Sequence, residues 1–318
     1  MSTATADVSK RKAWVMAARP QTLPAGAAPV VVGVGMAVHA DVAAPVPAVA
    51  ALVGALLLQV GTNFANDYYD AVKGADTDER EGFTRVTAGG LIEPREVKRA
   101  MIATYALAVL VGSYLVAVGG VPIVVVGLSG IAAGVLYTGG PLPYGYRGLG
   151  DLFVFVYFGL VAVTGTYYVQ AVASMEGVGL FPAGLPPGSV PPAVVVASLP
   201  AAGLSTAILV VNNIRDRETD AAAGKKTLVV YLGYAWSRVE YLALVGMAYV
   251  VPVVFALDPA YGLPALAPLL SLPLAVAVSR TVLTRSDGEA LNPALERVGK
   301  TLFLHSLLFA VGLGVAGL

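Results

Sequence analysis

Long apolar segments, separated by short breaks rich in charge, glycine or proline, run along almost the whole chain. Many of them approach the roughly 20 residues that a helix needs to cross a hydrocarbon core of about 30 Å. Because lipid offers no hydrogen-bond partners, such segments must satisfy their own backbone groups as helices, and they are too long for barrel strands. The pattern predicts an all-α integral membrane protein with a single domain over residues 1–318. Nine transmembrane helices are expected, at residues 22–38, 44–66, 98–118, 121–137, 150–170, 191–212, 238–257, 262–284 and 298–317.

The composition supports a membrane environment. Of the 318 residues, 57% are hydrophobic and 13% are charged, a charged share about half that of a soluble domain. A soluble protein of this length could not bury so much apolar surface, so we expect membrane lipid to surround most of the chain. The formal net charge is +0, which gives no sign of nucleic-acid binding. Cysteine is absent, and this excludes disulfide bonds, thiolate nucleophiles and sulfur-based metal sites.

The basic residues predict the orientation of the chain. All 20 lysines and arginines fall before or at the start of the first expected helix, or in and beside the breaks that follow the second, fourth, sixth and eighth helices. Basic loops are retained on the cytoplasmic side of a membrane. We therefore expect the polar tail at residues 1–12 and these breaks to face the cytoplasm, in the inner (plasma) membrane of a cell. The chemistry of the protein is expected on the same side.

The second expected helix runs into a first acidic motif. Asn66 and Asp70 are four residues apart and so share one helix face. Asp76 returns to that face only if the helix ends near Gly74, and glycine is a common helix terminator. The side-chain oxygens could then converge on Mg2+, which takes oxygen ligands and often shares its shell with substrate phosphates.

A second acidic motif ends the sixth expected helix. Asn212, Asp216 and Asp220 repeat the four-residue spacing and form a ladder roughly 12 Å long on one face. Two such ladders facing each other would hold a diphosphate between metal ions. Solvated charge at a helix end is the plain alternative for either motif alone, but it does not explain two matched motifs on one side of the membrane. A Ca2+ loop is a weaker alternative, because the Asp-x-Asp spacing with a terminal Glu is missing.

These motifs, in their wider context, resemble the UbiA-type membrane prenyltransferases. The likeness extends from ARPQTLPA at residues 18–25 to the last helix, and it is closest to the 1,4-dihydroxy-2-naphthoate polyprenyltransferases of menaquinone synthesis. In the more widespread form of the first motif the second aspartate interval is four residues rather than six, and six is typical of the menaquinone branch. The segments that carry the branch resemblance are NDYYDAVKGADTDER (66–80), YTGGPLPYGYRGLGD (137–151), GTYYVQ (165–170), NNIRDRETDAAAGKKTL (212–228) and LNPAL (291–295).

The resemblance implies a fold, a reaction and a metal site. The expected fold is nine helices around a central cavity that opens laterally to lipid, under a cytoplasmic cap formed by the loops after helices 2 and 6. The expected reaction transfers a polyprenyl group from a polyprenyl diphosphate to 1,4-dihydroxy-2-naphthoate, with loss of diphosphate and CO2, and gives a demethylmenaquinol. Mg2+ is the implied cofactor. The implied metal and diphosphate ligands are Asn66, Asp70, Asp76, Asn212, Asp216 and Asp220, with Asp70 and Asp216 central to catalysis.

Cations on the same side of the membrane are candidates for binding the diphosphate, because arginine grips phosphate oxygens in a bidentate fork and lysine acts as a point charge. Arg147 is expected to pair with the acceptor carboxylate or the diphosphate, and Tyr137 to lie near the allylic cation. Ordinary membrane anchoring is the alternative explanation for the cations and for Tyr137. The candidate diphosphate-binding residues are Arg19, Lys73, Arg80, Arg85, Arg215 and Lys225.

The sequence also leaves other interpretations of the function open. A sister prenyltransferase would use 4-hydroxybenzoate, homogentisate, chlorophyllide or haem instead of the naphthoate. A secondary transporter would need ionisable groups near the middle of the bilayer, whereas this chain keeps its acidic residues at helix ends. The sequence does not fix the length of the prenyl chain, the number of Mg2+ ions or the oligomeric state, for which a homo-oligomer is one alternative.

Overall fold

The computed structural model describes residues 8–74 and 85–317, and this part of the chain consists of helices and turns without a β-strand. The elements, in chain order, are α1 (Lys10–Ala18), η1 (Pro20–Thr22), α2 (Leu23–His39), α3 (Pro45–Val72), α4 (Pro94–Leu136), η2 (Tyr144–Arg147), α5 (Gly150–Phe155), the π-helical turn η3 (Val156–Val161), α6 (Ala162–Ser174), α7 (Pro192–Ala222), α8 (Leu228–Leu257), η4 (Leu263–Ser271), α9 (Leu272–Thr284) and α10 (Gly288–Ala316).

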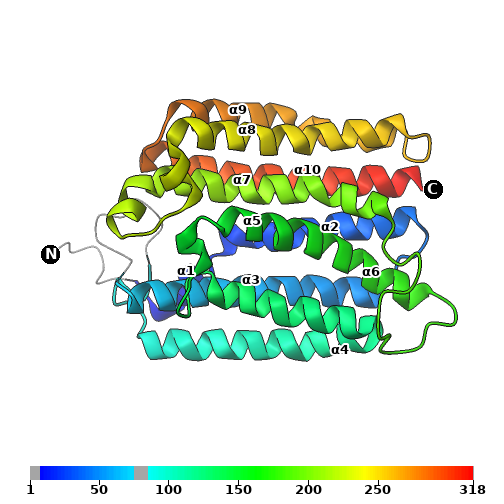
Figure 1. The fold of residues 1–318 in the computed structure, drawn as a ribbon, viewed down its shortest axis with the longest axis horizontal. Helices are drawn as coiled ribbons and strands as arrows, with labels where there is room; N and C mark the ends of the chain where they lie inside the picture. The colour runs from blue at the N-terminus through cyan, green and yellow to red at the C-terminus, as the bar shows by residue number, and fades with distance from the viewer. Residues whose placement is uncertain (1–7, 75–84, 318) are drawn as a thin grey trace.

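The long helices lie side by side along the long axis of the molecule (Figure 1). Large apolar side chains stay exposed on their outer faces, among them Leu110 and Leu128 on α4 and Val250 on α8. Water would oppose an apolar surface of this extent, whereas lipid accepts it. The chain is therefore a multi-pass membrane protein, and the predicted all-α architecture is confirmed.

The number of membrane helices differs from the prediction by one. Eight helices among the described residues are long and apolar enough to cross a membrane, where nine were expected. The difference lies in α4, which covers both helices expected at 98–118 and 121–137. Its backbone breaks at Gly120, where φ is 63° and ψ is −148°, a conformation that glycine adopts readily. The chain doubles back there, so that the two arms of α4 lie against each other. A methyl group added at Gly134, on the second arm, would lie 2.6 Å from the hydroxyl of Tyr105 on the first arm.

Helix ends near the polar residues also differ from the prediction in detail. The first expected helix is preceded by α1, and Arg19 joins α1 to η1 with φ 51°. Helix α3 continues six residues past the expected end at Asn66, to Val72. Gly74 follows with φ 65°, so the expected glycine terminator is confirmed. The extension keeps Asn66 and Asp70 on one continuous helix face.

Helix α7 lies at the centre of the bundle. It packs against α2, α5, α8 and α10, and small residues permit this close packing. Ala202 lies against Gly159 of η3, and Gly203 lies against the Leu244 carbonyl of α8. Most of α7 up to Asp216 is consequently buried among other helices, and the helix carries the second acidic motif to one end of the molecule.

Candidate active site

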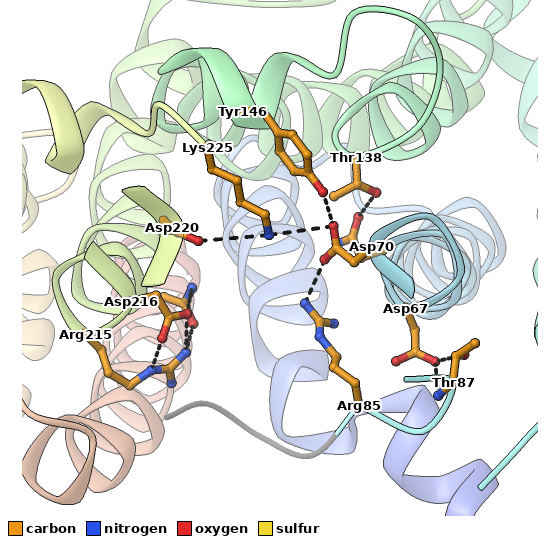
Figure 2. Close-up of polar contacts among 12 residues, drawn as sticks. Asp67, Asp70, Arg85, Thr87, Thr138, Tyr146, Arg215, Asp216, Asp220 and Lys225 are labelled. Atoms are coloured by element: carbon orange, nitrogen blue, oxygen red, sulfur yellow. Dashed lines mark hydrogen bonds and ion pairs between the residues drawn. The ribbon is translucent and has the colours of Figure 1, made fainter. Parts of the chain in front are cut away.

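The ends of α3 and α7 meet at one end of the bundle, where an ammonium group lies between two carboxylates. Lys225 Nζ is 3.7 Å from Oδ1 of Asp70 on α3 and 3.9 Å from Oδ1 of Asp220 on α7 (Figure 2). Each aspartate belongs to a different acidic motif. The prediction that the two acidic helix ends share one pocket is therefore confirmed.

Asp70 is held by groups from three other segments of the chain. Its side chain is 2% exposed, and Arg85 Nη2 donates a hydrogen bond to Oδ2 at 3.1 Å. The hydroxyl of Tyr146, in η2, donates to Oδ1 of the same carboxylate, which also faces Lys225 (Figure 2). A carboxylate buried to this degree is stable only when charges and donors surround it. The loop before α4, η2 and the loop after α7 thus converge on Asp70.

Asp216, in contrast, is bound by the neighbouring residue of its own helix. Arg215 Nε donates to Oδ1 and Arg215 Nη2 to Oδ2, both at 2.7 Å. Arg215 also donates to the side-chain oxygens of Asn212, at 2.8 Å, and Asn292 of α10, at 2.7 Å. The guanidinium fork matches the two carboxylate oxygens. Arg215 was expected to bind phosphate, but it does not line the cavity and instead orients Asp216.

Lys73 is also placed differently from the expectation. Its Nζ donates to the backbone carbonyls of Thr138, at 2.6 Å, and Gly140, at 3.2 Å, and it does not line the cavity. Burial lowers the pKa of Lys73, and the nearby Asp70 partly opposes this shift. Thr138 in turn donates to Asn66 Oδ1 at 3.1 Å. Lys73 therefore ties the turn after α4 to the first motif.

The segment at 137–147 contributes tyrosines rather than its arginine. Tyr137 and Tyr146 line the cavity, whereas Arg147 is exposed and does not. The expected pairing of Arg147 with substrate is not supported by this position, because the turn of η2 directs Tyr146 inward. Desolvation, and then the negative charge of Asp151, raise the pKa of Tyr137. A tyrosine phenol is already neutral at physiological pH, and this shift keeps it so.

A cavity of about 690 Å³ extends from the polar groups into the bundle. Its deeper walls are apolar, with Leu58 from α3, Val116 from α4 and Val161 from η3. Asp76 and Arg80 lie outside the described residues. The predicted site residues that line the cavity are Arg19, Asn66, Asp70, Arg85, Tyr137, Asn212, Asp216, Asp220 and Lys225.

Oxygen donors from both motifs surround the polar end of the cavity. Among the described residues, no three His, Cys, Asp or Glu side chains form a group that could hold a metal by themselves. Mg2+ typically binds one or two carboxylates and takes further oxygens from water and a substrate phosphate. Asp70 and Asp220 already accommodate one cationic group between them. The donor set therefore fits a divalent cation that a phosphate-bearing ligand helps to bind.

The contacts that were not foreseen from the sequence include two that involve buried aspartates. One is the Tyr146 hydroxyl on Asp70, described above. The other joins Asp67, which is 1% exposed, to Thr87, whose backbone N–H donates to Oδ2 at 3.2 Å and whose hydroxyl donates to the same oxygen (Figure 2). Asp67 thereby fixes the turn that carries Arg85. The YTGGPLPYGYRGLGD segment was a signal for Tyr146, but nothing in the sequence paired Asp67 with Thr87.

Comparison with known proteins identifies the family. The model of the UbiA prenyltransferase family matches residues 27–307. The chain is 38% identical to the 1,4-dihydroxy-2-naphthoate octaprenyltransferase of Escherichia coli, over 96% of both chains. It is 39% identical to that of Mycobacterium tuberculosis, over 93% of this chain and 95% of the relative.

Solved structures of UbiA homologues share the fold. The homologue from Aeropyrum pernix superposes with a TM-score of 0.65 at 16% identity, over 92% of this chain and 96% of the other. The homologue from Archaeoglobus fulgidus bound to DMAPP and Mg2+ gives 0.57 at 17% identity, over 94% and 99%. From the family match, the extended sequence identity and the shared fold, the chain belongs to the UbiA prenyltransferase family.

Proposed function

We propose that this protein transfers a polyprenyl group from a polyprenyl diphosphate to 1,4-dihydroxy-2-naphthoate, with Mg2+ as cofactor. The products are diphosphate, CO2 and a demethylmenaquinol. We also propose that the polar end of the bundle faces the cytoplasm from the inner membrane of a cell, because the basic residues gather at that end.

One structural observation carries the proposal: Asp70 and Asp220 lie on either side of a cation where the polar end of the cavity meets its apolar interior. A polyprenyl diphosphate has the same division, with a charged head and a long apolar chain. The names of four relatives at 34–39% identity, all 1,4-dihydroxy-2-naphthoate octaprenyltransferases, support the choice of acceptor. The titles of the Archaeoglobus structures, with DMAPP or GPP and Mg2+, support the donor class and the metal.

The donors for Mg2+ would be Asn66, Asp70, Asn212, Asp216 and Asp220, together with Asp76. Mg2+ would act as a Lewis acid toward the diphosphate oxygens. Breaking the allylic carbon–oxygen bond sends its electron pair to the diphosphate, so stabilising that growing negative charge is the main requirement. Arg85 and Lys225 lie at the polar end with their charges directed toward it. We assign both residues to binding the leaving diphosphate, together with Arg19 and Arg80.

Carbon–carbon bond formation would occur at the ring carbon that bears the carboxylate. The electron pair of the ring attacks the allylic carbon, and the pair of the breaking carbon–carboxylate bond then restores the aromatic ring as CO2 leaves. This sequence needs no base to remove a proton from the ring carbon. Tyr137 lies in the cavity wall as a neutral phenol, and we propose that its ring faces the allylic cation, which an aromatic face stabilises.

The test is an assay of the purified protein with octaprenyl diphosphate and 1,4-dihydroxy-2-naphthoate, with and without Mg2+. We expect a prenylated naphthalenediol and released CO2 only when Mg2+ is present. 4-Hydroxybenzoate is the control acceptor, since a sister prenyltransferase would prefer it. Product from 4-hydroxybenzoate alone, or from neither acceptor, would overturn the proposal.

A further inference from the structure

A second polar feature of the cavity lies deeper than the acidic motifs. Gln59 is on the same face of α3 as Asn66, seven residues earlier, which places it about 10 Å farther into the bundle. Its side chain lines the cavity although the residue is 8% exposed. Its Oε1 atom has no hydrogen-bond partner among the described residues. The proposed reaction does not use this atom.

The surrounding hydrogen bonds fix which end of the Gln59 amide is the oxygen. Its Nε2 donates to Thr22 Oγ1 at 3.0 Å and to Asn63 Oδ1 at 3.4 Å. The Thr22 hydroxyl donates to the Arg19 carbonyl at 2.9 Å. If the amide were reversed, Gln59 Oε1 would face the Asn63 oxygen and a hydroxyl whose proton is already used. The orientation is therefore determined, and it leaves a carbonyl oxygen as the open group.

Asn63 closes the network on its other side. Its Nδ2 donates to the Ala18 carbonyl at 2.9 Å and to Thr22 Oγ1 at 2.9 Å. The donors of Asn63, Thr22 and Gln59 are consequently all directed to acceptors within the network. What remains is an acceptor, so a ligand that completes the network must bring a hydrogen-bond donor.

Ser205 is a useful contrast. It lies on α7, lines the cavity and is 4% exposed, and its Oγ also has no partner among the described residues. A hydroxyl both donates and accepts, so Ser205 does not specify a kind of ligand group. Gln59 does, because only a donor satisfies its carbonyl oxygen.

We propose that Gln59 Oε1 accepts a hydrogen bond from a ring hydroxyl of the aromatic acceptor and so selects a hydroxylated ring. This inference rests on the proposed function. The polyprenyl chain offers no donor, whereas the acceptor offers two hydroxyls. The hydroxyl next to the carboxylate is engaged by that carboxylate within the molecule. The hydroxyl at position 4 is the free donor, and it is the group that Gln59 recognises.

The test compares two ligands on each variant of the purified protein in detergent. Binding of 1,4-dihydroxy-2-naphthoate and of 1-hydroxy-2-naphthoate, which lacks the 4-hydroxyl, is measured by calorimetry. In the wild type the dihydroxy compound should bind about 10- to 100-fold more tightly, as expected for one buried hydrogen bond. In Gln59→Met this ratio should fall to about 1. Because the ratio is taken on one preparation, a partly unfolded fraction does not change it, and Gln59→Leu provides a second variant.

Two control variants distinguish recognition of the ligand by Gln59 from a general disturbance of the cavity. Thr22→Val removes one acceptor of Gln59 Nε2, while Asn63 Oδ1 still accepts from Nε2 and keeps the amide in the same orientation. This variant should therefore weaken both ligands together and keep the ratio. Ser205→Ala should also keep it. The inference would be overturned if the ratio of the two affinities survived in both Gln59 variants, or if it disappeared in Ser205→Ala instead. In either case, prenylation of the naphthoate by the wild type would still uphold the proposed function. If neither naphthoate binds and no prenylated naphthalenediol forms, both proposals fall.

Discussion

Replacing Lys225 by methionine tests the shared pocket most directly. The substitution keeps an unbranched side chain that is one atom shorter and removes its charge. Lys225 Nζ is 3.7 Å from Asp70 and 3.9 Å from Asp220, and the side chain is 10% exposed. Screening by water is therefore weak, and among the described residues the ammonium lies between the two motifs. Its loss should weaken donor binding rather than acceptor binding.

The size of the effect follows from the geometry. A hydrogen bond to a charged group contributes about 1.5–3 kcal/mol, and we expect Lys225 to make one such bond with the diphosphate. Since about 1.4 kcal/mol corresponds to a factor of ten, kcat/KM for the polyprenyl diphosphate should fall about 10- to 150-fold. The Michaelis constant for the naphthoate should stay within about twofold, because the change is confined to the diphosphate end.

Steady-state kinetics with each substrate varied in turn measures both constants. Lys226→Met is the matched control, because Lys226 is the next residue and its side chain is exposed. It should retain wild-type kinetics. If Lys225→Met kept kcat/KM for the donor within twofold of the wild type, the ammonium would have no part in diphosphate binding. A larger loss for the acceptor than for the donor would equally refute the assignment.

The remaining predictions concern the second motif, the cavity wall and the metal. Arg215→Lys cannot reproduce the two-pronged contact with Asp216, so turnover should fall about tenfold or more, whereas Arg217→Lys, whose arginine is bound to the exposed Glu218, should change it little. Gly112 lines the cavity, and an added Cβ there meets no atom within 4 Å; Gly112→Phe should therefore lower the rate with octaprenyl diphosphate more than with geranyl diphosphate. Gly246, on α8, also has open space but does not line the cavity, so Gly246→Phe should leave that ratio unchanged. EDTA should abolish product formation and added Mg2+ should restore it.

Much of the fold was predictable because lipid imposes a simple length rule on apolar helices. The helices expected at 98–118 and 121–137 meet at Gly120, where the backbone of α4 breaks although no polar linker separates its two arms. The π-helical turn at η3, in contrast, is invisible to composition, because it changes only the hydrogen-bonding register inside an apolar segment.

The carboxylates of the site were predictable from their spacing, but their partners were not. Spacing along one helix fixes a shared face, so Asn212 and Asp216 could be placed together. Whether Tyr146 or Arg147 faces the cavity depends on a shift of one residue in a short turn, and no periodicity in the sequence determines that shift. Lys73 was assigned to phosphate by its charge alone, whereas carbonyls of the turn after α4 are its partners. Partners that are distant in the sequence can be identified only when the fold is known.

The two acidic motifs, similar in sequence, are assembled by different means. Asp216 accepts hydrogen bonds from the adjacent residue of its own helix, Arg215. Asp70 receives Arg85, Tyr146 and Lys225 from three loops, so this half of the site forms only after the loops pack. Loosening the loop that carries Arg85, or η2, should therefore disturb Asp70, whereas loosening the loop after α7 should disturb both motifs, because Lys225 also faces Asp220. The donor site is thus most vulnerable on the α3 side, because there the charges that neutralise a buried carboxylate are supplied by tertiary structure alone.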